Sequence, residues 1–261
     1  MIDLHTHLLP GVDDGSPTLE HSATVLARFA ADGVRGVVCT PHLSASESLS
    51  APIDEYSTLR ARLQALAPEA LTLYGGWEIM LDVPGTLKKS AGLSLGSSRA
   101  VLVEWPHANV PEWGTAELSR LRGNGLVPLV AHVERYRGVS LDLVREWRAL
   151  GAVVQTDATI LVTGGDRCEF AKAMLRDGLV DVLASDNHGD RRTLGMARWW
   201  LTEIGAVEQA ELLTNTNPAR LLQDQELLPV AGIAFEQGMF DRLRAWWRTR
   251  RTETAPNGNI S

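Results

Sequence analysis

Short apolar runs alternate along the chain with longer segments of helical periodicity. Seven runs rich in Val, Ile and Leu predict β-strands near residues 2–7, 36–41, 71–79, 100–105, 127–133, 153–157 and 180–186. Apolar residues at helical spacing predict six helices between or after them, at residues 18–32, 54–67, 111–123, 140–150, 167–177 and 193–205. Such repeated strand–helix units favour a parallel α/β barrel over an open sheet. A barrel of this kind carries its active site at the C-terminal ends of the strands.

Charge and cysteine content narrow the class of protein. The formal net charge of −7 argues against binding to nucleic acid or to anionic membrane in general, because those partners attract basic surfaces. The two cysteines, Cys39 and Cys168, lie far apart in apolar or helical contexts, so neither a disulfide framework nor a thiolate zinc motif is expected. The first residues are too polar for a signal peptide, and no run is apolar and long enough to cross a bilayer. A cytoplasmic protein is expected.

Residues of the types that bind metal ions stand at the ends of most predicted strands. His5 and His7 lie on one face of the first strand, because alternate residues of a strand project the same way. Asp14 follows in the next loop, and six of the seven strands deliver an imidazole or a carboxylate to the same predicted end. The candidate metal ligands are His5, His7, Asp14, His42, Glu78, Glu104, His132, Asp186 and His188.

The number and chemistry of these residues indicate a cluster of metal ions. A single His or Glu at a strand end is more often a structural or solvated residue, but a set of nine on one face is harder to dismiss. Mixed imidazole and carboxylate ligands suit zinc, manganese or iron better than calcium. Nine ligands exceed the needs of one ion, so two or three divalent ions are expected. Closely spaced ions are typical of phosphoester hydrolysis, because they activate a water and neutralise phosphoryl charge.

These residues, in this order, resemble the PHP (polymerase and histidinol phosphatase) metallohydrolases. The resemblance is closer to the bacterial capsular-polysaccharide type of manganese-dependent protein-tyrosine phosphatase. It begins at His5-Thr6-His7, includes His132-Val133-Glu134-Arg135-Tyr136 and Asp186-Asn187-His188, and ends near Asn217-Pro218. The resemblance implies an α/β fold, a distorted (β/α)7 barrel, with a metal cluster at the C-terminal strand ends and Glu78 as a bridging carboxylate. It also implies Mn²⁺ as the preferred ion, with Fe, Zn or Co as alternatives.

Three arginines are candidates for binding the phosphoryl group. Arg135 lies just past a strand end, where a guanidinium can donate to two phosphate oxygens, and the family motif implies this catalytic role. The family also has a second phosphate-binding Arg in the loop after Asp-x-His. Arg191 and Arg192 both lie there, and the sequence does not decide which one takes that role or whether either is only a surface charge.

The cysteines exclude the cysteine-dependent route to phosphotyrosine hydrolysis. That mechanism needs an Arg six positions after the nucleophile, but Ala45 follows Cys39 and Met174 follows Cys168 at that spacing. Attack by a metal-activated hydroxide without a phosphoenzyme is therefore expected, and no general acid is assigned.

Several neighbouring residues receive more ordinary interpretations. Asp13 is expected to shape the Asp14 loop, and Asp157 is either an outer-shell group or a capping carboxylate. Trp77 and Trp105 are expected to pack against outer helices, because strand alternation places them opposite their ligand neighbours.

The chain divides into a PHP-type metallophosphatase domain at residues 1–223 and a basic, amphipathic, partly disordered extension at residues 224–261. Residues 241–251 include five Arg, and Met239, Leu243, Trp246 and Trp247 would form one apolar helical stripe. The stripe fits either a helix docked on the barrel or on another subunit, which is favoured, or an interfacial helix at the inner face of the membrane.

Three functional hypotheses follow. The first is a metal-dependent phosphatase for protein phosphotyrosine, for which the resemblance implies a bacterial tyrosine autokinase of polysaccharide export as partner. The second is a phosphoesterase for a small phosphate monoester such as histidinol phosphate. The third is a metal-binding regulatory protein without turnover. The complete ligand set weakens the third, and the His-x-Glu-Arg-Tyr motif favours the first over the second.

Overall fold

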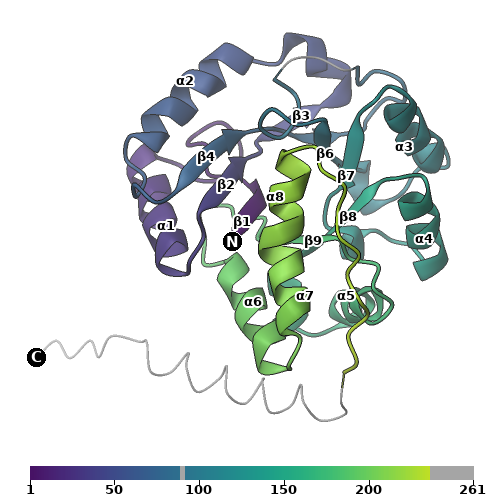
Figure 1. Ribbon diagram of the computed structural model, residues 1–261. Helices are drawn as coiled ribbons and strands as arrows, with labels where there is room; N and C mark the ends of the chain where they lie inside the picture. Colours follow the sequence, from purple (N-terminus) through teal and green to yellow (C-terminus); the bar gives the residue numbers. More distant parts are fainter. Residues whose placement is uncertain (89–91, 236–261) are drawn as a thin grey trace, which may run out of the picture.

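A parallel β-barrel forms the centre of the computed structural model, which describes residues 1–88 and 92–235 (Figure 1). Its strands are β1 (Ile2–Thr6), β2 (Gly36–Cys39), β3 (His42–Ser44), β4 (Thr72–Gly75), β5 (Glu78–Met80), β6 (Ala100–Glu104), β7 (Val127–Val130), β8 (Val153–Asp157) and β9 (Val182–Ala184). All the strand pairs are parallel. Each of the seven predicted strand regions contains a strand.

The third predicted strand is broken into β4 and β5, and a short strand that was not predicted, β3, follows the second predicted strand. The order of hydrogen-bonded strands is β1-β2-β4 in one sheet and β3-β5-β6-β7-β8-β9 in the other. Pro41 separates β2 from β3 and has no N–H to continue the ladder. Gly76 separates β4 from β5 at a crowded point, where an added Cβ would lie 2.6 Å from Leu95 Cδ2.

The barrel closes between its last and first strands. The His7 N–H donates to the carbonyl of Asn187 at 2.8 Å, and the Asp186 N–H donates to the carbonyl of His5 at 3.0 Å. The predicted distorted (β/α)7 barrel is therefore confirmed. These two bonds also bring the ligand motifs of β1 and β9 side by side.

Helices cover the outside of the barrel, as the sequence pattern predicted. They are α1 (Leu19–Ala31), α2 (Ile53–Gln64), α3 (Gly114–Gly123), α4 (Leu141–Ala149), α5 (Asp166–Arg176) and α6 (Leu194–Glu203). The Thr18 and Ser140 side chains cap α1 and α4 by accepting hydrogen bonds from backbone N–H groups of the first turn.

A further helical segment follows α6 and was not predicted. It consists of α7 (Val207–Glu211), a π-helical stretch (Leu212–Thr216) and α8 (Asn217–Leu222). Figure 1 shows this segment crossing the end of the barrel at which the strands begin. The opposite end, where the strands finish, carries the polar residues of the site.

The interior of the barrel is filled with apolar side chains rather than open as a channel. Leu4, Val38, Leu102, Leu129 and Val182 are fully buried in one cluster, and Leu221 of α8 packs against the same cluster. Burial of such side chains stabilises the fold by roughly 1.5–3 kcal/mol each. The filled interior makes a rigid base on which the strand ends hold their polar residues.

Two tryptophans pack under the outer helices, as expected from strand alternation. Trp105 is buried, and its ring centroid lies 6.2 Å from that of Trp147 on α4. Trp77 is also buried and stacks on Tyr56 of α2 at 4.9 Å between centroids.

Residues 224–235 run in extended form beside α5 (Figure 1). The buried Asn217 fixes the start of this segment, because its Nδ2 donates to the carbonyls of Asp181 and Leu228 while its Oδ1 accepts from the Leu228 N–H. Further on, Gly232 packs so closely that an added Cβ would lie 2.2 Å from the Arg176 carbonyl oxygen. The predicted apolar stripe beyond residue 235 lies outside the described residues. Within residues 1–88 and 92–235, no helix is long and apolar enough to cross a membrane.

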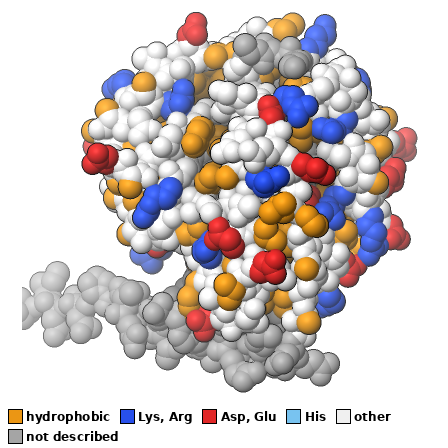
Figure 2. Space-filling model, in the orientation of Figure 1, with side chains coloured by type: hydrophobic (Ala, Val, Ile, Leu, Met, Phe, Trp, Pro, Cys, Tyr) orange, Lys and Arg blue, Asp and Glu red, His pale blue; other side chains and the backbone are white. Residues whose placement is uncertain are grey.

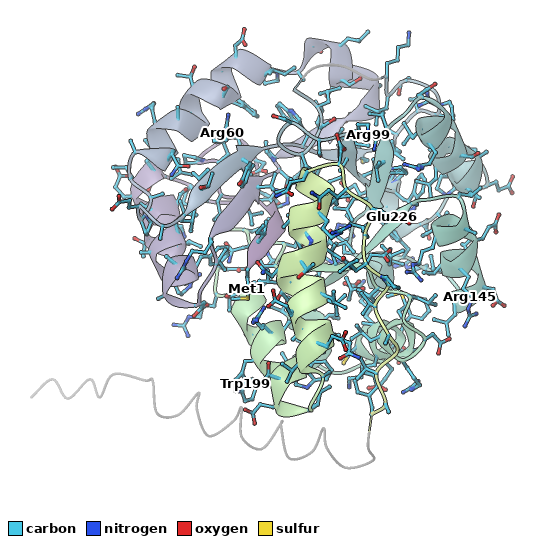
Figure 3. The ribbon with its side chains drawn as sticks, in the orientation of Figure 1. Met1, Arg60, Arg99, Arg145, Trp199 and Glu226 are labelled. Carbon is cyan, nitrogen blue, oxygen red and sulfur yellow. The ribbon has the colours of Figure 1, made fainter. Side chains whose placement is uncertain are left out.

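The face on which the strands begin carries charges of both signs. Figure 2 shows basic and acidic side chains interspersed on this face. Figure 3 places Arg99, Arg145 and Glu226 around it, with Met1 at the start of β1. Arg99 pairs with Asp224 at 3.3 Å, and such exposed ion pairs contribute little to stability.

Candidate metal centre

All nine predicted metal ligands lie together at the C-terminal ends of the strands. Their ligand atoms form four overlapping groups, within each of which all the atoms lie within 4.8 Å of one another. The groups are His7-Asp14-His42-His188, His5-Glu78-His132, His5-His7-Asp186 and His42-Glu78-Glu104. Since several residues belong to two groups, the arrangement suits adjacent ions that share ligands.

The first strand presents two imidazole nitrogens to one point. The Nε2 atoms of His5 and His7 lie 3.1 Å apart. The Nδ1 atom of His5 faces Oε1 of Gln155 at 3.1 Å, and Nδ1 of His7 faces Oδ2 of Asp13 at 2.7 Å. Each Nδ1–H can therefore donate outward, which leaves both Nε2 lone pairs directed inward, as metal ligation requires. Asp13 thus does more than shape its loop.

Glu78 lies at the centre of the cluster and is buried. Its Oε2 lies 3.2 Å from His7 Nε2 and 3.0 Å from His42 Nδ1, while its Oε1 lies 2.8 Å from His132 Nε2. Burial raises the pKa of this carboxyl, but His5 and His132 outweigh burial and hold the pKa well below its usual range. Glu78 therefore presents a carboxylate whose two oxygens face different groups of the cluster, as a bridging ligand would.

Asp186 connects the inner histidines to the arginines. Its Oδ1 lies 3.2 Å from His5 Nε2 and 3.3 Å from His7 Nε2, and its Oδ2 accepts from Arg135 and from Arg192. Burial would raise the pKa of Asp186, but these cationic neighbours keep it well below its ordinary value. The backbone of Asp186 has a φ of 48°, a strained conformation of the kind that clusters at functional sites.

One side of the cluster faces solvent. The side chain of Asp14 is 70% exposed, that of His42 is 42% exposed and that of His188 is 20% exposed. Asp14 Oδ1 nevertheless lies 3.3 Å from His42 Nε2 and 3.4 Å from His188 Nε2. A substrate can therefore reach the cluster from this side.

The structure distinguishes the two neighbouring arginines. Arg192 donates to Asp186 Oδ2 at 3.0 Å and lies 2.8 Å from His188 Nδ1. Arg191 is exposed and makes no hydrogen bond or ion pair to the described residues of the site. The geometry therefore favours Arg192 as the second cation beside the cluster.

Arg135 lies beside the cluster on the β8–β9 side. Its guanidinium contacts both Asp157 and Asp186. Burial lowers the pKa of Arg135, but Asp157 and Asp186 raise it further above its already high value, so the group is a permanent cation. Asp157 thus acts as an outer-shell group that holds Arg135, rather than as a capping residue.

Two buried residues of the site were missed from the sequence. Gln155 faces His5 from the middle of β8, and the available signal was a polar residue directly after the apolar pair Val153-Val154 of the strand. Glu134 was read only as part of the family motif, yet its Oε1 accepts from the Asp157 N–H at 3.2 Å. Burial and Asp157 raise the pKa of Glu134 well above its ordinary value.

The two remaining histidines, His21 and His107, belong to none of the four ligand groups. His21 Nε2 lies 2.6 Å from the Gly189 carbonyl oxygen and so connects α1 to the loop that carries His188. His107 is exposed in the loop after β6.

The fold and the site define a parallel barrel protein with four overlapping groups of His, Asp and Glu residues that could hold metal ions. The chain belongs to the capsular polysaccharide synthesis family CpsB/CapC, whose model matches residues 1–223. The predicted family resemblance is therefore confirmed.

Curated relatives agree with this membership. The chain is 31% identical over 244 residues to the tyrosine-protein phosphatase CpsB of Streptococcus pneumoniae, an alignment that covers 86% of this chain and 99% of the relative. It is 28% identical over 196 residues to the tyrosine-protein phosphatase YwqE of Bacillus subtilis, with 72% and 77% of the two chains covered.

Solved structures support the fold. A structure from the study of YwqE from Bacillus subtilis and CpsB from Streptococcus pneumoniae, described as unique metal-dependent tyrosine phosphatases, matches with a TM-score of 0.72 at 23% identity. That match covers 90% of this chain and all of the other. The phosphotriesterase from Mycobacterium tuberculosis matches with a TM-score of 0.50 at 13% identity over 78% of this chain and 85% of the other, a likeness of fold alone.

Proposed function

We propose that the protein is a metal-dependent tyrosine-protein phosphatase of capsular polysaccharide synthesis. The observation that carries the proposal is the pair of guanidinium groups of Arg135 and Arg192 on Asp186, directly beside the buried imidazole and carboxylate cluster. Cations and metal ligands placed together suit a phosphate monoester, whose charge must be neutralised during hydrolysis. The relatives named above carry the same activity in their names.

The nine clustered residues would hold two or three divalent ions. When bound, these ions would supply an activated water and neutralise charge on the phosphoryl oxygens. Asp13 and Gln155 keep His5 and His7 in the tautomer that presents Nε2 to the cluster. Arg135 and Arg192 would donate to the phosphoryl oxygens with the N–H groups not engaged by carboxylates, since each guanidinium has five donors.

The native ion and the protein substrate are further parts of the proposal. Mn²⁺ is proposed because the family resemblance implies it, while the imidazole and carboxylate donors also accept Fe, Zn and Co. A bacterial tyrosine autokinase is the proposed substrate, since the family acts in capsular polysaccharide synthesis. We propose a cytoplasmic location for the reaction.

Steady-state kinetics on a panel of substrates tests the proposal. After reconstitution with Mn²⁺, Fe²⁺, Zn²⁺ or Co²⁺, we expect phosphotyrosyl peptides to be hydrolysed with a higher kcat/KM than histidinol phosphate or simple sugar phosphates. The proposal would be contradicted if a small metabolite were hydrolysed efficiently while phosphotyrosyl peptides were not hydrolysed. Tight metal binding without any turnover would favour a regulatory protein instead.

A further inference from the structure

A pocket lined by both apolar and polar side chains opens beside the exposed part of the metal centre. Its volume is about 430 Å³, and His42 and Glu104 of the cluster contribute to its lining. This volume falls within the range of small-molecule sites, roughly 300–1,000 Å³. The pocket is thus continuous with the place where a phosphoryl group would meet the ions.

The apolar part of the pocket lining comes from two segments that lie side by side next to the cluster. Leu43 of β3 and Pro52 at the start of α2 form one side, and Met80 at the end of β5 forms the other. The stacked rings of Tyr56 and Trp77 add further apolar surface, and the polar side chains of Ser44 and Glu47 also line the pocket. Leu43, Pro52 and Met80 are each partly exposed, and Leu43 also packs against the main hydrophobic core.

A hydrogen-bonded contact fixes the distance between these two walls. The Ser46 N–H donates to Asp82 Oδ1 at 3.0 Å, and the Ser46 hydroxyl donates to Asp82 Oδ2. Ser46 lies in the 3₁₀ helix Ala45–Ser50 that follows β3, whereas Asp82 follows β5. Both segments also pair directly, because His42, Leu43 and Ser44 of β3 align with Glu78, Ile79 and Met80 of β5.

The pocket and the arginines lie on different sides of the cluster. The pocket is built over β3, β5 and β6, whereas Arg135 follows β7 and contacts the ends of β8 and β9. A phosphate monoester bound to the cluster would therefore have its phosphoryl oxygens towards the arginines and its organic group towards the pocket. A flat, apolar organic group fits walls made of Leu43, Pro52, Met80 and stacked aromatic rings.

We propose that this pocket binds the phenyl ring of the substrate phosphotyrosine and that Leu43 and Met80 determine specificity for aryl over alkyl phosphate esters. The proposal rests on the proposed phosphatase function and adds the residues that recognise the substrate. Phosphoserine and sugar phosphates have no flat, apolar aromatic ring to place there, so they would gain mainly the contacts made by phosphate.

Kinetics of Met80→Ala and Leu43→Ala test this assignment. With phenyl phosphate and with a phosphotyrosyl peptide, we expect KM to rise about tenfold, because apolar contact with the ring is lost. The inhibition constant of inorganic phosphate and the metal content should remain unchanged, since phosphate occupies only the metal centre. The preference for phenyl phosphate over an alkyl phosphate, measured as a ratio of kcat/KM, should fall with the same variants.

Leu66→Ala serves as the matched control, because Leu66 is 52% exposed and does not line this pocket. Unchanged KM values in both pocket variants, or an equal rise in KM and in the phosphate inhibition constant, would overturn the assignment. Failure of the unaltered enzyme to hydrolyse phosphotyrosine would instead remove the proposed function, so the two failures are distinguishable.

Discussion

At the scale of single residues, the site depends on groups outside the nine candidate ligands. His5 and His7 are useful ligands only if their Nδ1 atoms keep a proton, and Gln155 and Asp13 supply the acceptors for those protons. The sequence predicted which nine side chains come together, because strand alternation and the order of motifs are local properties. It could not identify Gln155, since the contact joins residues 150 positions apart and depends on closure of the barrel.

Removal of the Asp13 carboxylate tests this orienting role. Asp13→Ala should weaken metal binding about 10- to 100-fold, because His7 loses the acceptor that fixes its ring. Isothermal titration with Mn²⁺ measures the affinity. Glu69→Ala is the control, since Glu69 is an exposed carboxylate without a contact to the cluster. Equal affinities for the Asp13 and Glu69 variants would argue against the orienting role.

The two adjacent arginines form a natural matched pair. Arg192→Ala should lower kcat about 10²-fold, because a donor that neutralises phosphoryl charge is lost, whereas Arg191→Ala should behave like the unaltered enzyme. Arg135→Ala should reduce turnover at least as strongly as Arg192→Ala while metal content is retained. Turnover and metal content measured on the same preparations check these expectations. A large effect at Arg191 with none at Arg192 would reverse the assignment.

Metal binding should release protons. Burial would lower the pKa of His5, but Glu78 and Asp186 raise it to about 9, and Asp13, Asp186 and Glu78 raise that of His7 to about 11 despite burial. Below these pKa values the metal-free site is protonated, so ions must displace protons and affinity should rise as pH increases from 6 to 8. Calorimetry in buffers of different ionisation enthalpy counts the protons. Affinity that is independent of pH, with no proton released, would contradict this expectation.

At the scale of secondary-structure elements, periodicity predicted the seven strand regions and the six outer helices, but neither the break at Gly76 nor the additional strand β3. Both depend on which sheet each short strand joins, a property of the closed barrel. The segment from α7 to α8 was missed because Thr214, Asn215 and Thr216, followed by Asn217-Pro218, are weak helix formers. Contacts with the buried ends of β1 and β9 stabilise this segment instead.

The packing of residues 224–235 on α5 can be tested with glycine substitutions. Gly232→Ala should destabilise the protein by roughly 1–3 kcal/mol, because the new Cβ would collide with the Arg176 carbonyl. Gly123→Ala is the control, since a Cβ added at Gly123 would meet none of the heavy atoms considered within 4 Å. Urea unfolding gives the free energy of unfolding of each variant. Equal values for the two variants would mean that the close contact at Gly232 does not stabilise the packing of residues 224–235.

At the scale of the whole molecule, the two ends of the barrel have different roles, one structural and one at the candidate site. The end closed by α8 is filled with apolar side chains and fixes the strands, while the opposite end gathers the charged groups that a metal cluster and a phosphate would neutralise. The sequence predicted the fold class and the set of candidate ligands, because imidazole and carboxylate residues can be recognised at the ends of individual predicted strands. It could not reveal the pocket between β3 and α2, whose walls meet only after folding.

The central claim is that the nine clustered residues form a multinuclear metal site that drives hydrolysis of phosphotyrosine. The most direct test is the rate of phosphotyrosyl-peptide hydrolysis as Mn²⁺ is added back to chelator-stripped protein. The account predicts no turnover without metal and a rate that rises to a plateau at two or three bound ions per chain. Full activity of the stripped protein, or a rate that does not respond to added metal, would contradict it.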